Sequence, residues 1–163
     1  MNDWATRRDV WLIPVTFLAA LIIDRMAVPA SLAIFRPDLV AIMVVYWSLM
    51  APHRVGVTVA WVLGLLVDVA SGGLMGLSAA VLSLQAYGCL LCHQQVRVLP
   101  RFQQMLFVLI ILVVGKLLAA AVLGVTGRLP PPGFWLTLPA TVLLWPIVEE
   151  TLRRWRKEAA ISS

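Results

Sequence analysis

The stretch GVTVAWVLGLLVDVASGGLMG, residues 56–76, decides the fold of this chain. Small residues recur every fourth position at Gly56, Ala60 and Gly64, so a helix aligns them on one face. The same face ends at the carboxylate of Asp68. Because small side chains let a second helix backbone approach closely in lipid, we expect this stripe to be a helix-packing face.

Composition indicates an integral membrane protein. Of the 163 residues, 61% are hydrophobic and only 13% are charged, which lies outside the range of ordinary soluble domains. One helical span needs about 20 residues, so roughly six spans use most of the chain and leave short loops. We therefore expect an all-α, single polytopic membrane domain over residues 1–163, with spans near residues 10–25, 38–51, 55–70, 74–92, 105–125 and 134–149.

The basic residues predict the orientation of these helices. The net charge is +5, but the cations form short clusters between apolar segments and near both ends of the sequence, with Lys116 inside an apolar segment. If both ends are cytoplasmic, nine Lys and Arg residues face inward and three, Arg25, Arg36 and Arg128, face outward. This excess follows the positive-inside rule. We therefore predict an N-in, C-in topology and no nucleic-acid partner.

Asp68 and Lys116 are charges that interrupt long apolar segments. A charge at the bilayer centre costs roughly 3 kcal/mol on insertion scales, so each needs a partner or a wet cavity. At a rise of about 1.5 Å per residue, both lie about 20 Å from the starts of their helices and therefore at matching depth. We predict a polar centre of Asp68, Lys116 and Arg36, in which Asp68 pairs with either Lys116 or Arg36.

Cys89, Cys92 and His93 match the C-x-x-C-H spacing of covalent haem attachment. The predicted topology puts them at the cytoplasmic face, whereas such haems are attached on the outer side, and Cys is a common apolar filler of buried helices. His53 has no Cys or carboxylate close to it in the sequence that would complete a metal site. We expect no cofactor, no metal and no catalytic residues, with a redox protein as a minor alternative.

Several short motifs occur along the sequence in the order of a known membrane-protein family. They are FRP at residues 35–37, YW at 46–47, PHRV at 52–55, GLLVD at 64–68, SG at 71–72, LMG at 74–76, FW at 134–135 and LWP at 144–146. With these motifs the chain resembles the rod shape-determining protein MreD over about nine-tenths of its length.

The resemblance implies a multi-pass protein of the bacterial inner (cytoplasmic) membrane that is not an enzyme. It would help to maintain cell shape by positioning lateral peptidoglycan synthesis. MreC would be its most direct partner, with MreB, RodA and a penicillin-binding transpeptidase in the same assembly and membrane lipid around it. The resemblance also implies a fold similar to the substrate-binding subunits of energy-coupling vitamin transporters. The alternative function is therefore a carrier subunit that binds a small molecule or lipid near Asp68, Arg36 and Lys116.

Overall fold

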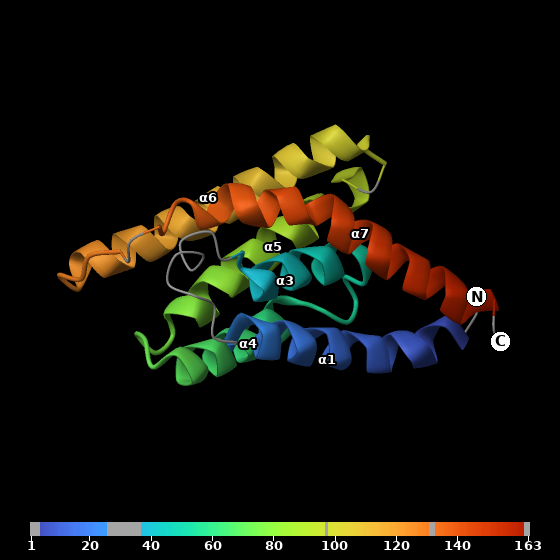
Figure 1. The fold of residues 1–163 in the computed structure, drawn as a ribbon, viewed down its shortest axis with the longest axis horizontal. Helices are drawn as coiled ribbons and strands as arrows, with labels where there is room; N and C mark the ends of the chain where they lie inside the picture. The colour runs from blue at the N-terminus through green and yellow to red at the C-terminus, as the bar shows by residue number, and fades with distance from the viewer. Residues whose placement is uncertain (1–3, 26–36, 97, 131–132, 162–163) are drawn as a thin grey trace.

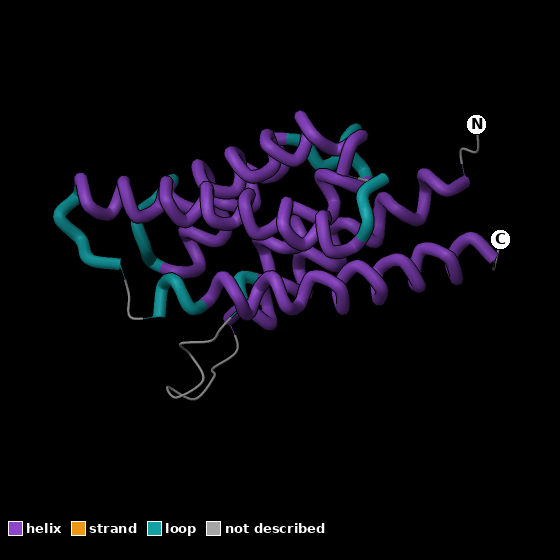
Figure 2. The backbone as a smooth tube through the Cα atoms, turned by 90° about the horizontal axis from the view of Figure 1, so that it is seen from above, coloured by secondary structure: helices purple, strands orange, loops and turns teal. Residues whose placement is uncertain are grey.

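The computed structural model describes residues 4–25, 37–96, 98–130 and 133–161, and within these ranges it contains six helices and no strands (Figure 1). The helices are α1 (Trp4–Arg25), α3 (Leu39–Met50), α4 (Val57–Ser71), α5 (Leu77–Val96), α6 (Arg101–Val125) and α7 (Thr137–Ile161). All six match predicted segments, in the predicted order. Helix α1 begins at the same end of the molecule at which α7 ends (Figure 1 and Figure 2).

Local signals explain where the helix boundaries differ from prediction. Helix α5 begins at Leu77 rather than near residue 74, because Gly72 and Gly76 have φ angles of 62° and 93° and form a turn. Helix α6 begins earlier than predicted, directly after Pro100, whose extended conformation starts the helix. Helix α7 continues through the basic tail to Ile161 instead of ending near residue 149.

One helix in the described part of the chain, α6, is by itself long and apolar enough to cross a membrane. Shorter apolar helical segments cover Leu12–Asp24, Leu39–Met50 and Val57–Ser71. The all-helical architecture is therefore consistent with a helical membrane protein. The crossing of all six helices, the N-in, C-in orientation and the single domain over residues 1–163 stay predictions.

Helix α3 is the core of the molecule. Its Tyr46 ring lies edge-on to Trp47 at 5.4 Å between centroids, and 6.3 Å from the ring of Trp145 in α7. The indole Nε1–H of Trp47 donates a hydrogen bond to Oγ1 of Thr16 in α1 at 3.0 Å. All three aromatic side chains are at most 1% exposed. Two of the sequence motifs, YW and LWP, therefore supply aromatic residues that hold α1, α3 and α7 together.

Helices α4 and α5 form a hairpin whose backbones approach closely at Gly64. A Cβ added to Gly64 would overlap the backbone N and Cα of Ala79 in α5 and lie 2.7 Å from the carbonyl carbon of Ser78. Ala60 is also completely buried, whereas Gly56 has open space where its Cβ would be. At Ala60 and Gly64, the small-residue stripe is therefore used for packing within this chain.

Candidate functional site

The carboxylate of Asp68 is buried where α4 turns into α5. Its Oδ2 accepts hydrogen bonds from the backbone N–H groups of Gly76 at 2.8 Å and Ala79 at 3.4 Å, and its Oδ1 accepts one from Ser78 N–H at 3.0 Å. The first N–H groups of a helix lack partners within the helix, and the helix dipole favours a negative charge there. Asp68, which is 4% exposed, therefore caps α5 from the preceding helix.

The predicted ion pair between Asp68 and Lys116 is not formed, although the structure describes both residues. The Lys116 ammonium lies over the ring of Phe134 instead, 4.5 Å from its centroid. Matching depth was insufficient to predict a pair, because backbone N–H groups of α5 already satisfy the carboxylate. Arg36, the alternative partner, lies outside the described residues. A functional role for the predicted polar centre stays a prediction.

Lys116 lines a cavity of about 160 Å³ between α3, α5, α6 and α7, to which α4 contributes one valine. Most of the wall is apolar, and the cavity lies where α3, α5 and α7 begin. Its polar lining consists of Asp38, Ser78, Gln85, Lys116 and Thr141. A polar lining between apolar helices is typical of a binding site rather than of simple core packing.

Gln85 of α5 is the buried amide in this wall. Its side chain is 3% exposed, and Oε1 has no hydrogen-bond partner among the described residues. The amide lies against Gly115 of α6, where an added Cβ would overlap Nε2 and lie 3.0 Å from Cδ. Gln85 and Lys116 both line the cavity, the first from α5 and the second from α6.

Asp38 and Thr141 join α3 to α7 beside the same cavity. The Oδ1 atom of Asp38 accepts a hydrogen bond from Ala41 N–H at 3.1 Å and so caps α3. The backbone N–H of Asp38 donates to Oγ1 of Thr141 at 3.0 Å, and that hydroxyl donates to the carbonyl of Thr137 at 2.7 Å. Asp38 forms no ion pair with Lys116, so the cavity wall contains a carboxylate and an ammonium that do not neutralise each other by contact.

Among the polar residues of the cavity, the sequence analysis named Lys116 as a candidate, as a partner of Asp68, and did not name Gln85, Thr141 or the role of Asp38. Gln85 had a recognisable signal, because an amide in the apolar middle of a helix needs a partner. Asp38 is only the first residue of the predicted span over residues 38–51. Its position beside the cavity depends on the packing of α7 against α3, which sequence spacing does not specify.

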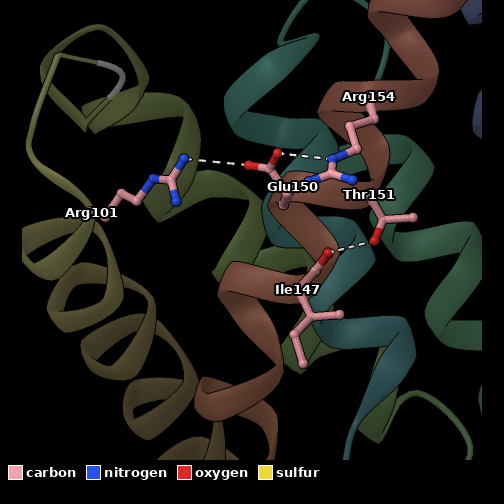
Figure 3. Close-up of polar contacts among 5 residues, drawn as sticks. All are labelled: Arg101, Ile147, Glu150, Thr151 and Arg154. Atoms are coloured by element: carbon pink, nitrogen blue, oxygen red, sulfur yellow. Dashed lines mark hydrogen bonds and ion pairs between the residues drawn. The ribbon is translucent and has the colours of Figure 1, made fainter.

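A second polar cluster, Arg101, Glu150 and Arg154, joins the start of α6 to the second half of α7 (Figure 3). Glu150 Oε2 lies 3.3 Å from Arg101 Nη2, and Glu150 Oε1 lies 3.0 Å from Arg154 Nε. The two arginine side chains are 67% and 70% exposed. A shallow groove runs beside them along Ile147 and Thr151.

The cysteines and histidine of the haem-like motif occupy ordinary helical positions. Cys89 is completely buried in the hydrophobic core, Cys92 is partly buried, and both are free thiols. The Nδ1 atom of His93 lies 2.7 Å from the carbonyl oxygen of Leu90 in its own helix. The described residues contain no group of three or more His, Cys, Asp or Glu that could hold a metal ion.

The bundle of helices with a partly polar cavity between them is consistent with a helical membrane protein. The sequence matches the family model of the rod shape-determining protein MreD over residues 6–155, so the chain belongs to this family of membrane proteins. The family has a role in rod shape determination. No solved structure matches the chain. The fold similarity to vitamin-transporter subunits therefore stays a prediction.

Proposed function

We propose that the chain is a non-catalytic, multi-pass subunit of the rod (elongation) complex in the bacterial inner membrane. Together with MreC, MreB, RodA and a penicillin-binding transpeptidase, it positions lateral peptidoglycan synthesis. The family match over residues 6–155 is the observation that carries this proposal, because it covers nearly the whole chain.

The apolar helix faces that remain exposed support a scaffold role. Residues 60 and 64 of the small-residue stripe pack within the chain, so partner segments must bind elsewhere. Large apolar side chains that are about half exposed extend along α4 and α6; they are Trp61, Val62, Leu66, Val69, Leu106, Ile110, Val114 and Leu117. In a membrane, such faces contact either lipid or the transmembrane segment of a partner. We propose that MreC binds one of these two faces.

Complementation tests the proposed function. In rod-shaped cells depleted of their own MreD, expression of this chain should restore the rod shape. The tagged chain, extracted in mild detergent, should also retain MreC on an affinity resin. Round cells that contain normal membrane levels of the chain, together with no retention of MreC, would contradict the proposal.

Matched variants test which exposed face binds MreC. The double variant Trp61→Ala/Leu66→Ala removes apolar contacts from α4, and Leu106→Ala/Ile110→Ala does the same on α6. The double variant on the face that binds MreC should no longer retain MreC on the resin. The double variant on the other face then serves as the control. If neither pair changes retention while both proteins are membrane-inserted, MreC does not bind these faces.

Cysteine labelling tests the proposed orientation. Val98, which is 83% exposed, precedes α6, and Leu129, which is 91% exposed, follows it. In a background with Cys89 and Cys92 replaced by Ala, a membrane-impermeant thiol reagent should label Leu129→Cys in intact cells. It should label Val98→Cys only after permeabilisation. The reverse pattern would contradict the N-in, C-in topology.

A further inference from the structure

We propose that the cavity between α3, α5, α6 and α7 binds a small zwitterionic group, with its anionic end at Lys116 and its ammonium end at Asp38. This inference does not rest on the proposed role in the rod complex. Three observations carry it: two charges of opposite sign in the cavity lining, a buried amide oxygen without a hydrogen-bond partner, and the size of the cavity.

The two charges define the electrostatics of the ligand. Lys116 contacts the ring of Phe134, and Asp38 caps α3 through one carboxylate oxygen. Neither forms an ion pair with a described residue. A purely anionic ligand would satisfy Lys116 but repel Asp38, and a purely cationic ligand would do the reverse. A zwitterion satisfies both charges and adds no net charge to an apolar environment.

Gln85 supplies the hydrogen bonds that such a ligand needs. A buried amide that forms no hydrogen bond destabilises a protein, so a group that binds it recovers this cost. Nε2 can donate to an oxygen of the ligand's anionic group, and the carbonyl Oε1 can accept a hydrogen bond from its ammonium. The missing side chain at Gly115 leaves the space that the Gln85 amide occupies against α6.

The cavity size limits the ligand to a small group. Its volume of about 160 Å³ is close to that of an engineered cavity of roughly 150 Å³ that holds benzene. The apolar wall, which includes Val40, Val81 and Leu112, suits a short methylene segment between the two charges. The ligand class is therefore a primary ammonium joined by a few carbons to a phosphate or carboxylate. Its source is either the head group of an ethanolamine phospholipid or a free zwitterion.

Lipid binding to the purified full-length chain tests this proposal. The probes are phosphatidylethanolamine, phosphatidylglycerol, phosphatidylcholine and soluble phosphoethanolamine, with native mass spectrometry and thermal unfolding as readouts. Phosphatidylethanolamine should bind one to one and raise the unfolding temperature. Phosphatidylglycerol has no ammonium and phosphatidylcholine has no N–H, so each should bind about tenfold more weakly or worse. Equal binding of all three lipids would overturn the proposal.

Soluble phosphoethanolamine distinguishes the two sources. If it raises the unfolding temperature by itself, the site accepts a free zwitterion. If only the intact lipid does so, the ligand is a membrane lipid whose acyl chains contribute to binding. Both results support the zwitterionic class. If neither phosphatidylethanolamine nor phosphoethanolamine raises the unfolding temperature, the zwitterionic ligand class is wrong.

Variants locate the binding site. Lys116→Gln and Asp38→Asn should each weaken phosphatidylethanolamine binding about tenfold or more. The Asn side chain retains the hydrogen bond that caps α3. The control is Arg128→Gln, which removes an exposed cation that does not line the cavity and should leave binding unchanged. Wild-type binding by folded Lys116→Gln and Asp38→Asn proteins would overturn the assignment.

Gln85→Leu keeps the test decisive if either charge variant fails to fold. This variant should raise the unfolding temperature of the ligand-free protein, because it removes a buried amide oxygen that has no hydrogen-bond partner among the described residues. It should also abolish the increase that phosphatidylethanolamine causes. A Gln85→Leu protein that is stabilised by phosphatidylethanolamine as much as the wild type would overturn the proposed site.

Discussion

The turn between α4 and α5 and the cavity beside α6 both contain charges inside apolar sequence, but they satisfy those charges differently. At the turn, the Asp68 carboxylate accepts three backbone hydrogen bonds from the start of α5. In the cavity, Lys116 contacts an aromatic ring and Gln85 Oε1 has no partner among the described residues. The comparison teaches that a buried polar group indicates ligand binding only when the fold leaves it unsatisfied.

The largest expected effect on the free energy of unfolding is at Gly64, close to the turn in which Asp68 is hydrogen-bonded. Gly64→Leu should destabilise the protein by about 3 kcal/mol or more, because the new side chain would overlap the Ala79 backbone rather than a movable side chain. The measurement is the free energy of unfolding in detergent. The control is Gly124→Leu, where nothing lies within 4 Å of an added Cβ. Equal effects at the two glycines would show that α4 and α5 are not in close contact.

The next effect is at Asp68. Asp68→Ala should cost about 2 kcal/mol, because it leaves N–H groups at the start of α5 without their acceptor. Asp68→Asn should cost less, since one amide oxygen still accepts a hydrogen bond. Unfolding curves of the two variants provide the comparison. If Asp68→Ala is as stable as the wild type, the carboxylate does not cap α5.

At two buried glutamines we expect smaller changes in stability, of opposite sign. Gln85→Leu should stabilise the ligand-free protein by about 1 kcal/mol, because the buried Oε1 atom of Gln85 has no hydrogen-bond partner among the described residues. The Oε1 atom of Gln104 also has no partner among the described residues, but Nε2 of Gln104 donates to the carbonyl of Val96 at 3.0 Å, so Gln104→Leu should destabilise the protein by about 1 kcal/mol. Both side chains are at most 5% exposed, so they are well matched. Destabilisation by Gln85→Leu would mean that its amide is satisfied.

The smallest effect of a single substitution is expected at the exposed cluster of Figure 3. Glu150→Gln should change the free energy of unfolding by about 0.5 kcal/mol or less, because Arg101 and Arg154, with which it forms ion pairs, are largely exposed. Any effect should shrink further as the salt concentration is raised. A loss above about 2 kcal/mol would show that this cluster is shielded from solvent.

Hydrophobic runs predicted the helices well, because each helix must bury or expose an apolar face over many residues. Boundary errors occurred where local geometry decides, as at Gly76 before α5 and at Pro100 before α6. The last span was predicted to end near residue 149, but α7 continues through the basic residues that follow, to Ile161. Glu150 and Arg154 carry opposite charges and lie four residues apart on one helix face, a spacing that is compatible with a continued helix.

The candidate site was predicted only in part. Asp68 was predicted to need a charged partner, whereas the groups that contact its carboxylate are backbone N–H groups, which charge spacing along a sequence does not reveal. A possible signal was the helix start a few residues after Asp68, beyond the glycine turn. The cavity could not be predicted, because it depends on how α3, α5, α6 and α7 pack against one another.

A double-mutant cycle on Asp68 and Lys116 tests the contrast between the two regions most directly. The free energies of unfolding are measured for the wild type, Asp68→Ala, Lys116→Ala and the double variant in the same ligand-free detergent. If the turn and the cavity are independent, the two losses add to within about 0.5 kcal/mol. A coupling energy above about 1 kcal/mol would show that the carboxylate and the ammonium interact, and would contradict the account.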